Sequence, residues 1–254
     1  MSASKPQHPA HRKFIGPPDR YDLNSAMQFN LLTALGLREE HTVLDIGCGS
    51  LRAGRLLITY LKPGKYFGIE PEQWLIDEGI DCEIGRDMIK IKQPTFNNDT
   101  NFTLTSFGRT FDFIIAQSIF SHASVAQIRR CLSEAKKSLA PTGVFAATIF
   151  PGETNYEGTE WVYPGCVKYT PEYFAGVVAD EGLTAKPLDW MHPKGQIWFA
   201  ITHPGHAPQE ITDTGRITIL QHEVAALNQE IAKLKSLHGL KLLKKLNRAV
   251  KGKK

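Results

Sequence analysis

Two short segments of this chain constrain its fold more than any other feature. The first is Val43-Leu44-Asp45-Ile46-Gly47-Cys48-Gly49-Ser50, and the second is Tyr66-Phe67-Gly68-Ile69-Glu70. The first reads as a buried strand followed by glycines, which let the backbone turn tightly and approach a ligand closely. Because the carboxyl ends of neighbouring parallel strands lie side by side, Glu70 is expected beside the glycine loop, where it can accept hydrogen bonds from a ribose diol. The pair of segments therefore predicts a nucleoside cofactor.

The spacing of the glycines narrows the choice of nucleoside. A dinucleotide-binding loop needs Gly-x-Gly-x-x-Gly, so that a pyrophosphate sits on the N-terminus of the following helix. Here Arg52 occupies the third glycine position, and the next glycine is Gly54. An acid, Asp45, also stands two residues before the first glycine. An NAD-dependent oxidoreductase is therefore the less favoured of the alternative functions.

The acid before the glycines resembles motif I of the class I S-adenosylmethionine-dependent methyltransferases, and Glu70 stands where that family has its ribose-binding acid. The resemblance runs from about residue 21 to residue 202, and its most specific parts are residues 43–50 and 111–122. It implies S-adenosylmethionine as the cofactor, with binding residues Asp45, Gly47, Cys48, Gly49 and Glu70. One departure is Leu51, at the family's usual third glycine, where a side chain can still point away from the ligand.

Strands and helices alternate along the middle of the chain, which predicts an α/β fold. We expect a doubly wound, mostly parallel seven-stranded sheet with helices on both faces and a C-terminal helical tail. In the family that the chain resembles, the last strand runs antiparallel to the others. Strands are expected at 43–46, 66–70, within 89–98, and at 111–117, 144–150, 183–188 and 196–202, and helices at 22–35, 50–60, 71–78, 125–139 and 171–181. The expected parts are a disordered arm (1–18), the methyltransferase domain (19–210) and a coiled-coil and basic tail (211–254).

Composition supports an ordinary globular protein, with 42% hydrophobic and 22% charged residues. No run of apolar residues is long enough to span a bilayer, and the first residues lack a hydrophobic signal segment, so we expect a cytoplasmic location. The four cysteines, at 48, 82, 131 and 166, are irregularly spaced. This spacing predicts neither a disulfide framework nor a metal-binding pair. We expect no metal, because a sulfonium methyl donor needs none.

The net charge of +4 is unevenly distributed. Residues 211–254 contain ten Lys and Arg against three Asp and Glu, so the preceding body is mildly acidic. An acidic body disfavours nucleic acid as a partner, since such binding depends on neutralising phosphates.

Four polar residues are candidates for contact with the cofactor or the acceptor. If the acceptor is a hydroxyl, a general base is needed, and histidine suits that role near neutral pH. His122 follows the fourth strand and His192 lies in a turn between the last two strands; each is equally a residue that only hydrogen-bonds the backbone. Gln117 and Ser118 lie at the carboxyl end of a central strand, where ligands bind in this architecture.

Two further positions carry open alternatives. Arg52 lies where a helix begins, and the positive end of a helix dipole disfavours a cation. It either meets the carboxylate of the methionine moiety or pairs with an acid of the body such as Asp22. Asp99 either accepts from the adenine amino group or belongs to a plain polar turn.

The loop at 151–169 contains the aromatic residues Tyr156, Trp161, Tyr163 and Tyr169. Aromatic rings with polar groups suit sugars or other small ring acceptors, although such a loop can also fold its rings onto the body. We therefore expect methylation of a small molecule or glycan, at a hydroxyl oxygen.

The tail shows a heptad pattern, with apolar residues spaced alternately three and four apart at 217, 220, 224, 227, 231 and 234. This pattern favours a parallel coiled coil and a homodimer through residues 217–234, with a helix packed on its own domain as the alternative. Beyond Gly239, leucines and lysines form a basic amphipathic segment. It is suited to peripheral contact with an anionic membrane at the inner surface, or it is a frayed terminus.

A non-catalytic adaptor that keeps this fold and assembles through its tail is the main alternative function. The chain keeps the residues expected to bind the cofactor, which argues against a site that has lost this function. They are Asp45, Gly47, Gly49 and Glu70.

Overall fold

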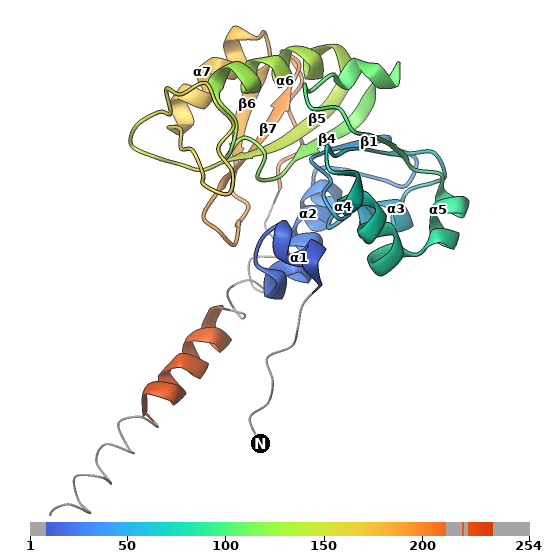
Figure 1. Cartoon of the computed structure of the whole chain (residues 1–254). Helices are drawn as coiled ribbons and strands as arrows, with labels where there is room; N and C mark the ends of the chain where they lie inside the picture. The colour runs from blue at the N-terminus through green and yellow to red at the C-terminus, as the bar shows by residue number, and fades with distance from the viewer. Residues whose placement is uncertain (1–8, 212–219, 221–222, 236–254) are drawn as a thin grey trace, which may run out of the picture. The chain divides into compact units, whose positions relative to one another are not determined.

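The computed structural model of the chain describes residues 9–211, 220 and 223–235, and it divides into two units, Met1–Asp213 and Thr214–Lys254. The first unit is built on one seven-stranded sheet in the order β3-β2-β1-β4-β5-β7-β6 (Figure 1). Strands β1 to β5 are parallel, and β7 is antiparallel to both β5 and β6. The expected doubly wound sheet with a reversed last strand is confirmed. The strands are β1 (Val43–Ile46), β2 (Tyr66–Ile69), β3 (Thr95–Asn97), β4 (Phe111–Ala116), β5 (Leu139–Ile149), β6 (Thr184–Leu188) and β7 (Ile197–Thr202).

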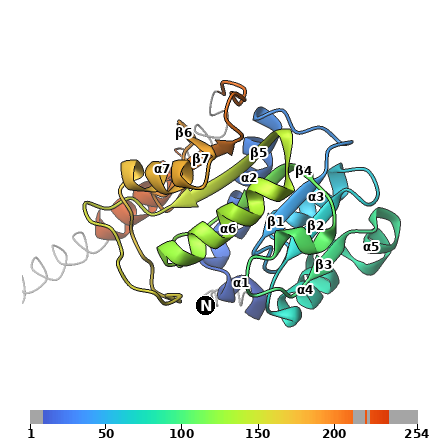
Figure 2. The same cartoon turned by 90° about the horizontal axis from the view of Figure 1, so that it is seen from above.

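Helices pack on both faces of the sheet. In Figures 1 and 2, α6 and α7 lie on one side, and α2 and α3 lie on the other. The α-helices are α1 (Ala10–Phe14), α2 (Tyr21–Ala34), α3 (Gly54–Tyr60), α4 (Gln73–Gly79), α5 (Arg86–Lys92), α6 (Val125–Ser138) and α7 (Pro171–Asp180). Short turns of other helix types are η1 (Pro18–Arg20), the π-helical η2 (Ile80–Ile84) and η3 (Leu104–Phe107).

Each face of the sheet has its own hydrophobic core. Side chains alternate across a strand, so in β4 Ile114 and Ala116 pack with α6 and α7, whereas Phe113 and Ile115 pack with α2 and α3. All four are buried. The near-continuous apolar run of β4 is explained by this burial on two sides, which is typical of a central parallel strand.

Helix α3 begins later than the sequence predicts. A helix is expected from residue 50, but α3 starts at Gly54, and the Ser50 side chain is fully buried within hydrogen-bonding distance of the Tyr21 hydroxyl. Residues 50–53 instead extend the loop after β1, because Leu51 takes a left-handed conformation with φ of 60°. Arg52 therefore lies in the loop and not in the first turn of a helix.

The N-terminal arm is more ordered than the sequence predicts. Residues 1–18 are expected to be disordered, but within the described part residues 10–14 form α1, and the His11 side chain is fully buried. The arm packs on the glycine loop, since a Cβ on Gly49 would lie 3.2 Å from the Ile15 side chain. Residues 10–20 thus border the candidate cofactor site.

In the second unit, residues 220 and 223–235 are helical, and every described side chain there is exposed. The exposed apolar residues include Leu220, Val224, Leu227, Ile231 and Leu234. Ile217 and the basic segment beyond Gly239 lie outside the described residues. Among the described helices, none is long and apolar enough to cross a membrane.

Candidate cofactor and acceptor site

The loop after β1 makes two turns that favour glycine. Gly47 has φ of +68° and Gly49 has φ of +54°, a region that residues with a Cβ avoid. A Cβ on Gly47 would lie 2.2 Å from Cδ1 of Ile119. The N–H groups of Gly47 and Cys48 donate to the carbonyl oxygen of Ile69, at 2.8 and 3.0 Å, which fastens the loop to the end of β2.

Glu70 lies beside this loop, as the strand arrangement predicts. Its Oε2 accepts a hydrogen bond from the Gly49 N–H, and its Oε1 accepts one from the Glu72 N–H, each at 3.0 Å. Burial raises the pKa of the carboxyl group, and the two backbone hydrogen bonds act in the opposite direction. Each oxygen keeps a lone pair for a further donor, which is what binding a ribose diol requires.

Asp45 is buried under the loop. Its Oδ2 accepts a hydrogen bond from the Tyr66 hydroxyl at 2.8 Å. Burial raises the pKa of Asp45 to about 6, against the opposing effects of Tyr66 and the Arg52 charge. When ionised, Asp45 places a negative charge below the loop. Its hydrogen-bond partner there is the Tyr66 hydroxyl.

Two residues of the loop turn their side chains into the core. The Cys48 thiol is buried against Gly68, so that only its main chain can face a ligand. Leu51, at the position where the resemblance expects glycine, is fully buried among the residues of α2 and α3. Its side chain points away from the cofactor side, as the sequence allows.

Arg52 is a half-buried residue that forms no ion pair among the described residues. Its Nη1 donates to the Ile15 carbonyl oxygen at 2.9 Å, its Nη2 donates to Gln117 Oε1, and its buried Nε has no hydrogen-bond partner. Asp22, the alternative partner, pairs instead with Arg55 at 2.6 Å. Burial lowers the pKa of Arg52. An anion is therefore the partner that this site lacks.

Gln117 and Ser118, at the end of β4, belong to a buried polar network. The Ser118 N–H donates to Thr148 Oγ1, and its hydroxyl accepts from Gln196 Nε2, both at 2.8 Å. Ser118 adopts a left-handed φ of 59°. Thr148 and Gln196 are missed by sequence reasoning, because each reads as an ordinary strand residue.

His192 extends the same network. Its Nε2 lies 2.8 Å from Gln117 Nε2, and its Nδ1 accepts from the Lys194 N–H at 3.1 Å. Burial and the nearby Arg52 charge lower the pKa of His192 to about 3. A buried ring with so low a pKa, whose Nδ1 already accepts a hydrogen bond, is poorly suited to take a proton from an acceptor.

His122 is held differently. Its Nδ1 lies 2.9 Å from the Val162 carbonyl oxygen and 2.7 Å from that of Gly165. Carbonyl oxygens only accept, so Nδ1 carries the proton and Nε2 presents the lone pair. The ring is part-exposed at the site, which makes His122 the better placed of the two histidines to act as a base.

Asp99 follows β3, and its carboxylate closes a local turn. Its Oδ2 accepts from the N–H groups of Asn101 and Thr103, at 2.9 and 2.7 Å. The neighbouring Asn98 donates to the main-chain oxygen of Glu70 at 2.8 Å. A contact between Asp99 and adenine stays a prediction.

Exposed aromatic rings gather where the arm meets the loop at 151–169. Phe14 lies 5.2 Å from Trp74 and 5.7 Å from Tyr163, and His122 lies 5.3 Å from Tyr163 and 5.6 Å from Trp161, measured between ring centroids. Burial and the charge of Glu70 raise the pKa of Tyr163, so this cluster lies within electrostatic reach of Glu70.

The sequence predicts part of this aromatic cluster. Trp161 and Tyr163 are exposed, whereas Tyr169 is buried and its hydroxyl donates to the Ala123 carbonyl oxygen. Phe14 and Trp74 are missed, because they come from the arm and from α4, far away in the sequence. The only sequence signal for these two residues is that each is an aromatic residue in a largely polar segment.

Comparison with known proteins agrees with this geometry. Residues 44–145 match a family model described as a methyltransferase domain. Residues 44–145 therefore form a methyltransferase domain. No curated protein sequence matches the chain at a significant level.

Solved structures of S-adenosylmethionine-dependent methyltransferases share the fold. Magnesium protoporphyrin IX methyltransferase of Synechocystis PCC 6803, with S-adenosylmethionine bound, superposes with a TM-score of 0.53 at 14% identity, over 78% of this chain and 86% of that one. A methyltransferase of Leishmania major gives a TM-score of 0.56 at 16% identity, over 74% of each chain. An amino pentose methyltransferase of Micromonospora echinaspora, also with S-adenosylmethionine bound, gives 0.50 at 14% identity, over 71% of this chain and 91% of that one.

Proposed function

We propose that this methyltransferase moves the methyl group of S-adenosylmethionine to a ring hydroxyl of a small molecule or glycan. The observation that supports the proposal is the position of His122, which follows β4 and donates from Nδ1 to two carbonyl oxygens of the loop at 151–169, so that the lone pair of the neutral ring is on Nε2. A hydroxyl acceptor needs a base within hydrogen-bond reach, whereas an amine acceptor that is already neutral does not.

Two residues, Glu70 and Arg52, bind the cofactor in this proposal. Glu70 accepts hydrogen bonds from the ribose, and Arg52, which lacks an anionic partner, binds the carboxylate of the methionine moiety. The cofactor supplies an electrophilic methyl group on a sulfonium. Because that methyl group needs no metal, the work left to the protein is to orient the acceptor, exclude water and accept one proton.

The acceptor end is formed by the exposed rings of Phe14, Trp74, Trp161 and Tyr163. Flat aromatic faces bind the apolar faces of sugar rings and of aromatic rings, and the neighbouring polar groups set their orientation. Transfer to a hydroxyl oxygen forms a carbon–oxygen bond and breaks the carbon–sulfur bond. The hydroxyl proton passes to Nε2 of His122, while Nδ1 stays hydrogen-bonded to the loop carbonyls.

The test is a screen of acceptors for production of S-adenosylhomocysteine, comparing free sugars, nucleotide sugars and phenols with primary amines. We expect turnover with a hydroxyl acceptor and a fall in kcat of about 100-fold or more in His122→Gln, with the dissociation constant of S-adenosylmethionine unchanged. Turnover only with amines, or a fully active His122→Gln enzyme, would overturn the proposal.

We propose two further features for the tail. The exposed apolar residues of the helix at 223–235 pair with those of a second copy to make a homodimer. The basic segment beyond Gly239, which lies outside the described residues, brings the enzyme to an anionic membrane surface on the cytoplasmic side. Vesicles with and without anionic lipid, tested for co-sedimentation with the full chain, distinguish such contact from a free protein.

A further inference from the structure

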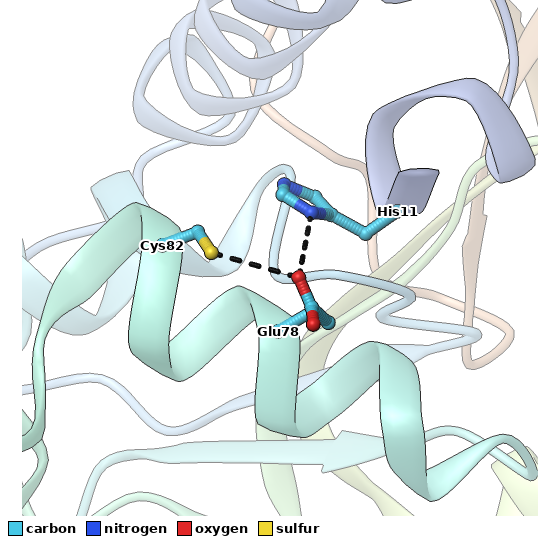
Figure 3. Close-up of side chains that lie close together, drawn as sticks. All are labelled: His11, Glu78 and Cys82. Atoms are coloured by element: carbon cyan, nitrogen blue, oxygen red, sulfur yellow. Dashed lines mark hydrogen bonds and ion pairs between the residues drawn. The ribbon is translucent and has the colours of Figure 1, made fainter. Parts of the chain in front are cut away.

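Three potential metal ligands from two separate parts of the chain lie together beside the arm. They are His11 of α1, Glu78 of α4 and Cys82 of η2, and their ligand atoms all lie within 4.8 Å of one another (Figure 3). Glu78 and Cys82 are four residues apart, so their side chains project from the same face where α4 continues into η2. The histidine comes from the arm, more than sixty residues earlier in the sequence.

Two of the three distances between the ligand atoms match the edges of a tetrahedral zinc site. His11 Nδ1 lies 3.3 Å from Glu78 Oε2, and Cys82 Sγ lies 3.6 Å from the same oxygen. Zinc bonds of about 2.0–2.1 Å to nitrogen and oxygen, and of about 2.3 Å to sulfur, give tetrahedral edges of about 3.3 and 3.6 Å. The third pair, His11 Nδ1 and Cys82 Sγ, lies within 4.8 Å, so the three atoms can share one ion after an adjustment of the exposed Cys82 side chain.

The state of the histidine supports a cation at this point. His11 is fully buried, its Nε2 lies 2.8 Å from Glu83 Oε1, and its Nδ1 has no hydrogen-bond partner. Glu83 is itself held by Arg12, at 2.6 and 2.7 Å, so it serves as a fixed acceptor for the Nε2 proton. The Nδ1 lone pair then faces the Glu78 carboxylate. Two electron-rich atoms at 3.3 Å repel each other unless a proton or a metal ion lies between them.

The surroundings favour a metal ion over a proton. A proton on Nδ1 would need a well-aligned bond to Glu78, and the geometry does not provide one, whereas a metal also uses the Cys82 sulfur. A ligand histidine that donates its other N–H to a carboxylate is the usual arrangement at zinc sites. Glu78 and Cys82 are exposed, so an ion can enter from solvent.

We propose that His11, Glu78 and Cys82 bind a zinc ion, with water as the fourth ligand. The mixed nitrogen, oxygen and sulfur set suits Zn²⁺ better than Mg²⁺ or Ca²⁺, which prefer oxygen alone. The ion joins α1 to α4 and η2, and so fastens the arm whose Ile15 covers the glycine loop. It stabilises the closed arm and takes no part in methyl transfer, so this proposal stands independently of the acceptor.

The experiment titrates Zn²⁺ into the full, untagged chain after treatment with a chelator, by calorimetry. We expect about one ion to bind per chain, and affinity to fall at least about tenfold in Cys82→Ser. Cys166→Ser, which removes another exposed thiol, is the matched control and should bind as the wild type does. Cys82 is on the surface, so its loss leaves the fold intact. Glu78→Gln provides a second variant with the same expectation.

A second measurement separates a metal site from an ion pair. Trypsin cleaves after Arg12 and Lys13 when the arm opens, and Zn²⁺ should slow this cleavage in the wild type and in Cys166→Ser but not in Cys82→Ser. No stoichiometric binding by the wild type, or equal binding and equal protection in Cys82→Ser, would overturn the proposal and leave His11 as a protonated partner of Glu78 and Glu83.

Discussion

At the residue scale, the path of the glycine loop depends on small residues in the elements that pack against it. Gly79 of α4 is an example, because a Cβ there would lie 2.6 Å from the main-chain carbon and oxygen of Ser50. The backbone of the loop thus rests directly on the helix. The cofactor site is shaped by this contact as much as by its own glycines.

We predict opposite effects for two helical glycines replaced by alanine. Gly79→Ala should destabilise the protein by about 1–3 kcal/mol, since the loop backbone must move to admit the methyl group. Gly176→Ala, in α7, adds a Cβ with no atom within 4 Å and should stabilise it by about 0.5–1 kcal/mol. Urea unfolding of both variants measures the difference, and equal midpoints would show that the close contact has no energetic consequence.

The sequence predicts the residues of the loop better than their surroundings. Spacing alone predicts that Gly47, Gly49 and Glu70 lie side by side, because local backbone geometry and the ends of adjacent strands bring them together. The hydrogen-bond partners of Arg52 are not predicted, because Ile15 and Gln117 come from segments far apart in the chain. Which of His122 and His192 can act as a base also depends on burial, which neither local sequence reveals.

At the scale of elements, strands and helices are predicted well where the apolar pattern is long. The observed β4 and α6 agree with the predicted strand and helix, because a continuous apolar run and a helical repeat of apolar residues are different sequence patterns. The start of α3 and the order in the arm are missed. Leu51 in a left-handed conformation delays α3, and α1 is too short to have a period, so its order comes from the burial of His11.

The tail helix carries a prediction of its own. Ile231→Lys places a charge among the exposed apolar residues of the helix and should convert a dimer into a monomer in sedimentation experiments. Gln229→Lys, on the other side of the helix, adds the same charge and should leave the dimer intact. A wild-type monomer, or a dimer that survives Ile231→Lys, would exclude pairing through this helix. Cofactor affinity should be the same in all three proteins.

At the scale of the whole molecule, buried ionisable groups make stability depend on pH. Burial lowers the pKa of His192 to about 3, and the unfolded chain has the ordinary value near 6.5. The unfolded state therefore binds the proton more tightly, so stability falls as the pH drops below about 6.5. Burial raises the pKa of Asp45 to about 6, which acts in the opposite direction below that pH.

Comparing the wild type with His192→Gln isolates the histidine, because Asp45 is present in both. Between pH 7 and pH 5, we expect the free energy of unfolding of the wild type to fall by about 2 kcal/mol more than that of the variant. Urea unfolding at the two pH values measures this. Parallel losses in the two proteins would show that His192 is already protonated in the folded state.

Calorimetric titration of S-adenosylmethionine measures whether the glycine loop and Glu70 bind the cofactor. Glu70→Ala removes the acceptor for the ribose hydroxyls and should weaken binding by about 10- to 100-fold. Glu72→Ala, an exposed neighbour whose N–H to Glu70 is retained, should bind as tightly as the wild type. Unchanged affinity in Glu70→Ala, or no binding by the wild type, would show that these residues do not form the cofactor site.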